Sequence, residues 1–382
     1  KMDTIDEVDN PLHEVPTPFA PANEQPLHND TDPSQQHLDS PDYNVIAFYY
    51  PWYGNPKFDG KYIHWRHEVL DSSKRIIEPP GDIAADYYPA LGTYSSGDPE
   101  IIEQHMIMLN TAKIGTISVS WWGRDQADKQ GGYTDRLMHI LLDIAQQYGI
   151  KVCIHLEPYK DRSAKSVSED LDYLRDHYHS HEAMFRWSKQ SNRPLVFVYD
   201  SYLIQSNDWK EMFDQRKQRK SPLSEESLVI GLVVEKRHLS QLKQAGFDGM
   251  YSYFATDGFT FGSTLRNWPD IQQFAHANDM FFIPSVGPGY ADLKIRPWNV
   301  QNQRPRTPEY YDREWQAALS IEPELISITS WNEWHEGTQI EPCAPKPGFA
   351  GCETLPPDYY LTRTRHWIDE WQKNQSEPRN NP

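Results

Sequence analysis

The chain has 382 residues, a formal net charge of −18, and an aromatic content of 13%. This length allows one large domain or two ordinary ones. The acidic balance argues against a nucleic-acid binder and against docking on anionic lipid, because both need a basic face. The longest apolar run, residues 228–234, is too short to span a membrane. Abundant aromatic residues in an acidic chain favour sugar recognition, in which rings stack on pyranose faces and carboxylates bind hydroxyls.

Residues 1–42 differ in composition from the rest of the chain. They are rich in Asp, Glu and Pro, contain Lys1 as the only Lys or Arg, and hold few large apolar residues. Such a segment cannot bury enough apolar surface to offset its chain entropy. We therefore expect a disordered acidic tail, either an ordinary solvated tail or a spacer from a membrane. Lys at position 1 suggests a trimmed product from which a signal peptide or anchor was removed.

From residue 43 onward, apolar runs of strand length alternate with segments of helical period. The runs are nearly continuous, which is typical of parallel strands covered on both faces. We expect strands over 44–50, 116–121, 151–156, 194–199, 228–234, 247–253, 280–286 and 324–330. We expect helices over 98–112, 133–148, 166–190, 207–218, 237–245, 267–278, 308–320 and 357–373. Asp98 and Pro99 supply an N-cap and a first-turn proline, and Gly149 and Gly246 stand where helices should end.

Eight strands, each followed by a helix, predict an α/β fold with a single (β/α)₈ TIM barrel over 43–376 and a short disordered tail over 377–382. A doubly wound open sheet is the alternative. It would usually carry a glycine-rich phosphate-binding turn, and no such motif follows a strand here. The connection 51–97 is far longer than an ordinary βα loop. Its Trp, Tyr, Gly and Pro content predicts an ordered functional loop rather than a second domain.

The active site of such a barrel lies at the carboxyl ends of the strands. The residues there are mostly aromatic or charged: Tyr49, Tyr50, Trp52, Trp121, Trp122, His155, Glu157, Tyr199, Asp200, Glu235, Tyr253, Tyr290, Arg296, Trp298 and the segment 331–336. Structural alternatives exist for each. Because side chains alternate along a strand, one member of each Tyr pair and Trp pair should pack under the helices. His155 could be a core histidine, Asp200 a helix cap and Glu235 an ion-pair partner. Carboxylates at four strand ends of one face favour an acidic, aromatic cleft.

The segment after the eighth strand is the sharpest signal. It reads SITSWNEWHEGTQIE and places Glu333 and Glu336 just beyond a buried run. Glycoside hydrolysis uses two carboxyl groups that flank the glycosidic bond, one protonated as acid and one ionised as base or nucleophile. Trp331 and Trp334 would supply an apolar wall that raises one pKa, and Asn332 could hold the other carboxylate. The alternative, a solvated acidic loop, would leave two Trp side chains exposed.

At this motif the sequence resembles glycoside hydrolase family 99, the endo-α-1,2-mannosidases and mannanases. The resemblance implies a (β/α)₈ barrel that cleaves internal α-1,2-mannosidic bonds with retention of anomeric configuration. It also implies a route through a 1,2-anhydro sugar, in which the substrate's own 2-hydroxyl is the nucleophile. Similar segments follow the family order over about 44–341: FYYPWYGNPKFDGKYIHW (48–65), YPALGTYSSGDPE (88–100), HLEPYKDR (155–162), VYDSYL (198–203), AGFDGMYSYFA (245–255), FIPSVGPGY (282–290), IRPWN (295–299) and SITSWNEWHEGTQIE (327–341).

The resemblance also implies roles for individual residues. It makes Glu333 the base that removes the 2-hydroxyl proton and Glu336 the general acid. It implies no metal and no cofactor. The expected partner is an α-mannoside oligosaccharide or polysaccharide, and the protein is expected to be an exported monomer, periplasmic or extracellular if bacterial and in the Golgi lumen if animal-like. The substrate contacts implied are Tyr50, Trp122, His155, Glu157, Tyr253, Arg296, Trp298 and Asn332.

Trp122 bears on the choice of substrate. Animal Golgi members, which release Glc-α-1,3-Man from glucosylated N-glycans, resemble SWYPPG at this place, whereas this chain reads SWWGRD. Trp at this position resembles the bacterial mannan-cleaving members. The sequence therefore favours α-mannan or high-mannose chains with mannose in the −2 subsite, and the Golgi-type activity is the alternative.

Two other classes of function stay open at the sequence level. One is a non-catalytic mannan-binding barrel, against which the retained Glu333 and Glu336 argue. The other is a metal-dependent hydrolase that would use His155, Glu157, His335 and Glu336. The absence of an HExxH motif and of Cys/His ligand spacing argues against that hydrolase.

The three cysteines have structural interpretations. Cys153 lies in an apolar run and is expected to be a buried thiol. Cys343 and Cys352 bracket a Pro/Gly loop. A small disulfide, which would imply an oxidising compartment, and two free thiols fit this spacing equally well.

Overall fold

The computed structural model describes residues 40–67, 77–219, 221–352 and 354–376. The expected disordered tails therefore lie outside the described residues, apart from 40–42. Asp42, which the sequence analysis assigned to the tail, is the first residue of strand β1 (Asp42–Tyr49). The ordered chain thus begins just before the predicted boundary.

The strands form a closed parallel barrel. Pairing follows the order β8-β7-β6-β5-β3-β2-β1-β10-β9. Only Pro284 separates β8 from β9, and β8 pairs with β7 while β9 pairs with β10, so the sheet closes on itself. The predicted eight-stranded barrel is confirmed. After β1, the strands are β2 (Ile114–Trp121), β3 (Lys151–Leu156), β5 (Arg193–Val198), β6 (Leu228–Leu232), β7 (Gly249–Tyr251), β8 (Phe281–Ile283), β9 (Ser285–Val286) and β10 (Ile326–Ile328).

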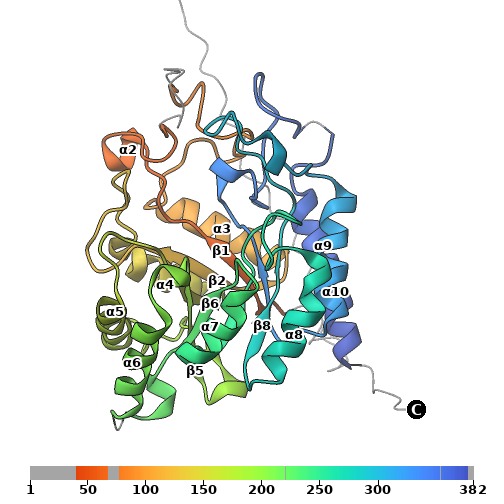
Figure 1. Ribbon diagram of the computed structural model, residues 1–382. Coiled ribbons are helices and arrows are strands. Elements are labelled where there is room, and N and C mark those ends of the chain that lie inside the picture. The colour runs from red at the N-terminus through yellow and green to blue at the C-terminus, as the bar shows by residue number, and fades with distance from the viewer. Residues whose placement is uncertain (1–39, 68–76, 220, 353, 377–382) are drawn as a thin grey trace, which may run out of the picture. The chain divides into compact units, whose positions relative to one another are not determined.

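A helix follows each barrel strand, and Figure 1 shows these helices around the outside of the strands, with α2 (Pro56–Asp59) and long loops gathered at one end. Two of the predicted helix-capping residues take the expected roles. Asp98 accepts a hydrogen bond from the N–H of Glu100 at 3.0 Å, and Gly246 ends α7 with φ +94°. No helix within the described ranges is long and apolar enough to cross a bilayer. The helices are α3 (Pro99–Thr111), α4 (Met138–Gln147), α5 (Ala164–His177), α6 (Ser206–Lys217), α7 (Arg237–Ala245), α8 (Trp268–His276), α9 (Pro308–Ser320) and α10 (Tyr359–Ser376).

The predicted helix over 166–190 is wrong in its second half. Helix α5 ends at His177, and the chain then forms strand β4 (Arg186–Trp187), which pairs antiparallel with β5, and a 3₁₀ helix (Ser188–Gln190). The guanidinium of Arg186 donates to the backbone carbonyls of His179, Asn192 and Ser224, which holds this non-helical turn. Phe185 and Trp187 of this segment instead pack in the cluster inside the barrel.

The core has two layers that share the strands. On β1, Val45, Ala47 and Tyr49 pack outward against the helices, whereas Ile46 and Phe48 belong to the cluster inside the barrel. This alternation decides which strand-end side chains can reach the barrel mouth.

The long connection after β1 is ordered where it is described. Gly54 pairs with Ile63, and Trp65 is buried and stacks on Tyr53 at 4.2 Å. Cys343 and Cys352 form a disulfide. The backbone of Cys343 also forms an isolated antiparallel β-bridge with Pro89, which lies in this connection. Cys153 is a buried thiol, as predicted.

Candidate active site

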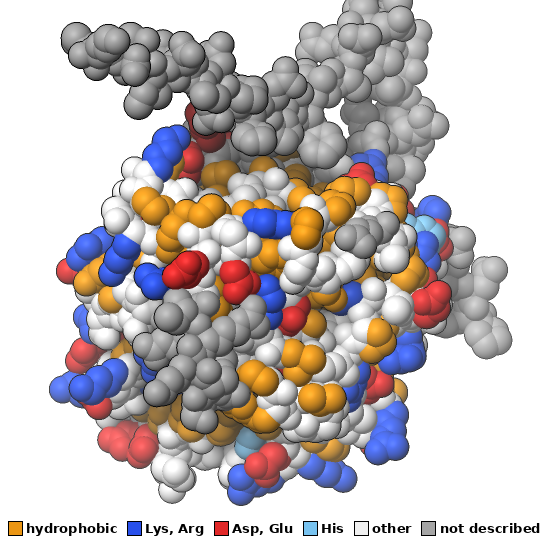
Figure 2. Space-filling model, turned by 90° about the horizontal axis from the view of Figure 1, so that it is seen from above, with side chains coloured by type: hydrophobic (Ala, Val, Ile, Leu, Met, Phe, Trp, Pro, Cys, Tyr) orange, Lys and Arg blue, Asp and Glu red, His pale blue; other side chains and the backbone are white. Residues whose placement is uncertain are grey.

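A pocket of about 230 Å³ lies at the carboxyl ends of the barrel strands. Figure 2 views this end of the molecule, where hydrophobic side chains lie between acidic and basic ones. Side chains from segments following seven of the barrel strands meet here, as the fold requires. They are Tyr50, Trp52, His64, His67, Trp122, Asp128, Lys129, Gln130, His155, Glu157, Pro158, Tyr199, Tyr253, Ile295, Arg296, Glu333, His335 and Glu336.

Glu333 immediately precedes the 3₁₀ helix η7 (Trp334–Glu336) and caps it. Its Oε1 accepts a hydrogen bond from the backbone N–H of His335 at 3.0 Å and lies 3.4 Å from Nδ1 of the same residue. The side chain is almost fully buried. Burial, and then the charge of Glu336, raise the pKa of Glu333 well above its ordinary value.

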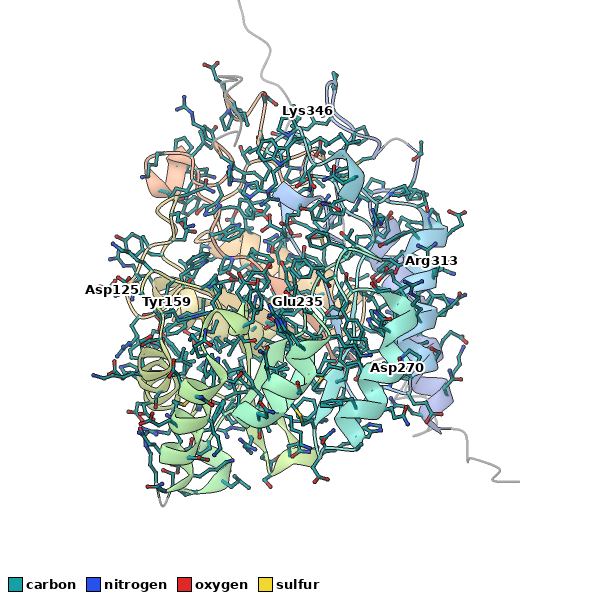
Figure 3. All side chains as sticks on the ribbon, in the orientation of Figure 1. Asp125, Tyr159, Glu235, Asp270, Arg313 and Lys346 are labelled. Atoms are coloured by element: carbon teal, nitrogen blue, oxygen red, sulfur yellow. A yellow bond between two sulfur atoms is a disulfide. The ribbon has the colours of Figure 1, made fainter. Side chains whose placement is uncertain are left out.

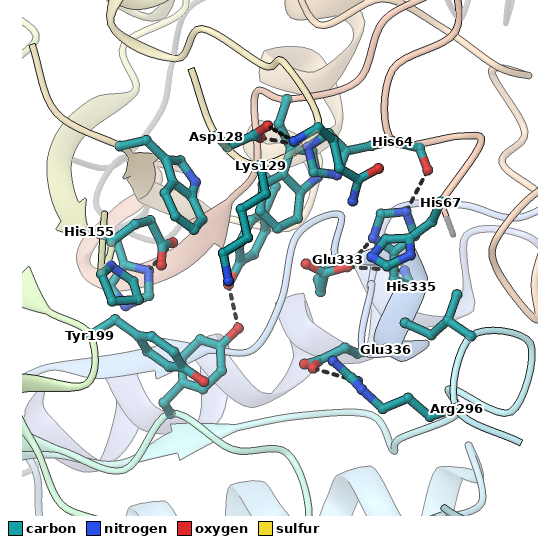
Figure 4. Close-up of a pocket in the computed structure, with 18 residues that line it drawn as sticks. His64, His67, Asp128, Lys129, His155, Tyr199, Arg296, Glu333, His335 and Glu336 are labelled. Atoms are coloured by element: carbon teal, nitrogen blue, oxygen red, sulfur yellow. Dashed lines mark hydrogen bonds and ion pairs between the residues drawn. The ribbon is translucent and has the colours of Figure 1, made fainter. Parts of the chain in front are cut away.

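Glu336 faces Arg296 (Figure 4). Nη1 of Arg296 lies 3.3 Å from Oε1 of Glu336, 3.1 Å from Oδ2 of Asp292 and 3.2 Å from the hydroxyl of Tyr290. Burial raises the pKa of Glu336, and the charge of Arg296 opposes this rise. Arg296 thus links the carboxyl of Glu336 to the buried Asp292 and the partly buried Tyr290.

The two carboxyl groups share a pocket but have different partners. Glu336 is held by a guanidinium, and Glu333 by a backbone N–H beside an imidazole. Glu333 is buried and Glu336 is partly buried. Two carboxyl groups that interact in such surroundings resist simultaneous ionisation, so the pair favours a state that holds one proton. An acid beside a base is the combination that glycosidic bond cleavage needs.

Other predicted contacts converge on the opposite side of the pocket, where Figure 4 shows His155 and Tyr199. Nε2 of His155 bonds the hydroxyl of Tyr251 at 2.9 Å, and its Nδ1 lies 3.3 Å from Oε1 of Glu157. The hydroxyls of Tyr50 and Tyr253 hydrogen-bond each other. Tyr253 has φ +56°, a conformation that costs a bulky residue about 1–3 kcal/mol and is typical of functional sites.

Alternation separates the Tyr and Trp pairs as predicted. Tyr50 lines the pocket, whereas the hydroxyl of Tyr49 bonds His105 on α3 at 2.9 Å. Trp122 lines the pocket, whereas Nε1 of Trp121 donates to Asp135 at 2.8 Å.

Two predicted contacts lie elsewhere. Asn332 is fully buried beneath the pocket, where it accepts from the N–H of Tyr50 at 2.7 Å and donates to the carbonyl of Tyr50 at 3.1 Å. It therefore positions Tyr50 and does not hold either carboxylate, which corrects its predicted role. Trp298 does not line the pocket; its side chain is 52% exposed on the loop that follows β9.

The predicted apolar wall is also corrected. Trp331 and Trp334 are completely buried, and Nε1 of Trp334 donates to Glu341 at 3.0 Å. Neither lines the pocket, and the tryptophans that do are Trp52 and Trp122.

The four-carboxylate pattern holds only in part, because Asp200 and Glu235 do not line the pocket. Asp200 is half-buried and accepts from Tyr202. Glu235, labelled in Figure 3, is exposed. It pairs with Arg237 at 2.8 Å. Side chains at strand ends turn inward only where the following loop directs them there.

The structure adds pocket residues that were not among the predicted site residues. His64 and His67 come from the long loop after β1, and Asp128, Lys129 and Gln130 from the loop after β2. Lys129 points into the pocket between His155 and Glu333 (Figure 4). These residues lie in loops without periodicity, so only their path in space brings them to the site.

Within residues 40–67, 77–219, 221–352 and 354–376, no group of three or more His, Cys, Asp or Glu side chains has an arrangement that could hold a metal ion. His155, Glu157, His335 and Glu336, the ligands considered from the sequence, line one pocket but form no such group.

Comparison with known proteins identifies the family. The model of glycosyl hydrolase family 99 matches residues 40–373. The chain belongs to this family. A glycoprotein endo-alpha-1,2-mannosidase of Mus musculus is 44% identical over 350 residues, covering 87% of this chain and 75% of its own length. A glycoprotein endo-alpha-1,2-mannosidase-like protein of Homo sapiens is 42% identical over 353 residues, with 87% and 77% covered.

A solved member of family 99 supports the same assignment. The GH99 endo-alpha-mannosidase from Bacteroides thetaiotaomicron superposes with a TM-score of 0.81 at 42% identity, covering 88% of this chain and all of that structure. The predicted family, barrel fold and glycosidase class are confirmed.

Proposed function

We propose that this family 99 glycosidase cleaves internal α-1,2-mannosidic bonds of α-mannan or high-mannose glycans with retention of configuration. The observation that carries the proposal is a pair of carboxyl groups, the buried Glu333 and the partly buried Glu336, in one pocket with unlike partners. The name of the mouse relative, an endo-alpha-1,2-mannosidase, supports this bond type, and the name of the bacterial relative supports an endo-acting α-mannosidase.

In the proposed first step, Glu333 removes the proton of the substrate's 2-hydroxyl. The 2-oxygen attacks C1 from the face opposite the leaving group, because both lie axial in an α-mannoside. Glu336 protonates the leaving oxygen, and a 1,2-anhydro sugar and a shortened glycan result. In the second step, Glu336 takes a proton from water, the water oxygen attacks C1, and the 2-oxygen recovers its proton from Glu333.

The remaining side chains are assigned supporting roles. Arg296 holds Glu336, and its positive charge counters the rise in acid pKa that burial causes. The neutral hydroxyls of Tyr50 and Tyr253 and the side chains of His155 and Glu157 offer hydrogen bonds to sugar hydroxyls. Trp122 offers a stacking face for the sugar beyond the cut, and Trp298 offers one for a longer chain.

Product analysis tests the bond and the substrate together. The enzyme is incubated with yeast mannan and, separately, with a glucosylated high-mannose N-glycan, and the released sugars are identified. We expect α-1,3- or α-1,2-linked oligosaccharides from mannan, formed with retained configuration. Release of Glc-Man from the N-glycan, with no attack on mannan, would contradict the mannan preference inferred from Trp122 and favour the Golgi-type activity.

Two variants serve as controls for that experiment. Glu333→Gln and Glu336→Gln should each fail to release products while retaining substrate binding. Binding without turnover in the unmodified protein would instead identify a non-catalytic mannan-binding barrel.

A third variant tests the substrate preference: Trp122→Tyr should shift relative turnover toward the glucosylated glycan.

We also infer an exported location. The disulfide between Cys343 and Cys352 is typical of oxidising compartments. Retention of full activity in a protein isolated from a reducing cytosol with both thiols free would argue against this inference.

A further inference from the structure

His335 lies between Glu333 and the loop after β1. The atoms next to its two ring nitrogens determine which nitrogen carries the hydrogen. Nε2 lies 2.8 Å from the backbone carbonyl oxygen of His64. A carbonyl oxygen only accepts hydrogen bonds, so Nε2 carries the hydrogen. In the neutral ring, Nδ1 is then unprotonated, and this atom is 3.4 Å from Oε1 of Glu333 (Figure 4).

The surroundings of His335 keep its ring neutral. The side chain is almost fully buried. Burial lowers the pKa of His335 well below its ordinary value. The charges of His67, His64 and Arg296 add to this effect, and the hydrogen bond to the His64 carbonyl opposes it. A neutral imidazole cannot donate from both nitrogens, so its only donor is committed to the His64 carbonyl.

The carbonyl that fixes the ring is itself held in place. His64 has φ +61°, and its Nε2 lies 2.6 Å from Oδ2 of Asp128. Its ring stacks on Trp52 at 4.3 Å. The orientation of the His335 ring therefore depends on an anchored backbone group.

We propose that His335 is a positioning residue that makes Glu333 a stronger base, by directing the Nδ1 lone pair at its carboxylate. The proposal rests on the proposed function, in which Glu333 takes the proton of the substrate's 2-hydroxyl. A lone pair facing a carboxylate disfavours the ionised form. It favours the protonated form, which Glu333 adopts once it has accepted that proton.

Other groups around Glu333 act independently of the His335 ring. The charges of Glu336 and Glu157 raise the pKa of Glu333, whereas Arg296 lowers it. The backbone N–H of His335 also lowers it, but this group is retained in every side-chain variant. Three phenols complete the surroundings: Tyr50, Tyr53 and Tyr253.

Two variants distinguish the effect of the Nδ1 lone pair on Glu333 from a structural effect of replacing His335. His335→Gln keeps an amide donor for the His64 carbonyl but leaves no lone pair at the position of Nδ1. His335→Asn places an amide beside Glu333, and its N–H can donate to the carboxylate. The acidic limb of kcat/KM against pH reports the base in the free enzyme. We expect its midpoint to fall in the order wild type, Gln, Asn, by roughly half a unit to one unit per step.

The same series measures rate. A weaker base should lower the plateau of kcat/KM roughly three- to tenfold in His335→Gln, mostly through kcat. A loss of rate with an unmoved acidic limb would mean a merely structural role and would overturn the proposal. An unchanged rate and limb would overturn it equally.

A measurement on the wild-type enzyme does not depend on the variants folding. Nitrogen-15 NMR of the labelled histidines should show His335 with a protonated Nε2 and an unprotonated Nδ1 at neutral pH, and the ring should stay neutral at a pH where exposed histidines become protonated. A protonated Nδ1 at neutral pH would sink the inference. Glu333→Gln distinguishes this failure from failure of the proposed function, because activity retained in that variant removes Glu333 as the base whatever the tautomer of His335.

Discussion

At the scale of single residues, the two carboxyl groups differ in what holds them, and the difference predicts a pH profile. Burial raises the pKa values of both Glu333 and Glu336. The base must be ionised, so kcat/KM should rise as the pH passes the lower apparent pKa of the pair. The acid must be protonated, so kcat/KM should fall as the pH passes the upper one.

Glu336→Gln tests this assignment. A glutamine cannot donate the proton, so we expect kcat on a glycan substrate to fall by about 10²–10⁴. On an aryl glycoside with a good leaving group the loss should be much smaller, and the alkaline limb of the profile should disappear. Steady-state kinetics on both substrates measure this. Equal losses on the two substrates would contradict an acid role for Glu336.

At the scale of elements, the loops after β1 and β2 are joined over the pocket by Asp128. Its Oδ2 pairs with Nε2 of His64 at 2.6 Å, and its Oδ1 accepts from the N–H groups of Gln130 and Gly132 at 2.8 and 2.9 Å. A Cβ at Gly132 would lie 2.8 Å from Oδ2 of Asp128, so only glycine fits this close approach. Burial alone would raise the pKa of Asp128, but His64 and the two N–H groups lower it.

Asp128→Ala should release the loop that carries Lys129 and Gln130. We expect KM to rise roughly three- to tenfold with a small change in kcat, which corresponds to the loss of one or two hydrogen bonds. Asp125→Ala is the matched control, because Asp125 is on the same loop with an exposed side chain. The pKa of Asp128 is lowered, so its contribution to the stability of the folded loop is present above the unfolded pKa of the carboxyl group. This contribution is lost as the pH falls through the folded pKa. A KM equal to that of the control would show that the pair does not hold the loop.

At the scale of the whole molecule, the pH dependence of the free energy of unfolding should reflect a buried carboxyl group that does not line the active-site pocket. Glu314 on α9 is almost fully buried, and its Oε1 has no hydrogen-bond partner within the described part of the chain. Its neighbour Arg313 lies on the outer side of the helix (Figure 3). Burial raises the pKa of Glu314 well above its ordinary value, and the hydrogen bond with Tyr310 opposes this.

A group with a raised folded pKa contributes stability that is complete below the unfolded pKa and is lost as the pH rises through the folded pKa. Glu314→Gln removes this loss, so the variant should exceed the wild type in free energy of unfolding at alkaline pH, by about 1–3 kcal/mol. Denaturant unfolding at pH 5 and pH 8 measures the difference. Glu309→Gln, an exposed position on the same helix, is the control. Parallel pH dependence in wild type and Glu314→Gln would refute the prediction.

The amino-acid sequence by itself determined the barrel and the place of the carboxyl pair. Nearly continuous apolar runs form buried strands, as in Leu228–Leu232 of β6, because parallel strands are covered on both faces. Glu333 and Glu336 follow such a run and had to emerge at the carboxyl end of the barrel. Alternation along a strand also separated Tyr50 from Tyr49 correctly.

Only the tertiary structure decided which loop side chains reach the site. Trp334 is buried although its motif suggested a pocket wall, and Glu235 turns to solvent although it follows a strand. Asp128 and His64 meet although 64 residues separate them in the chain. The physical reason is that strand geometry fixes the direction of each side chain locally. A loop has no repeating geometry, so its side chains are directed by whatever packs against it.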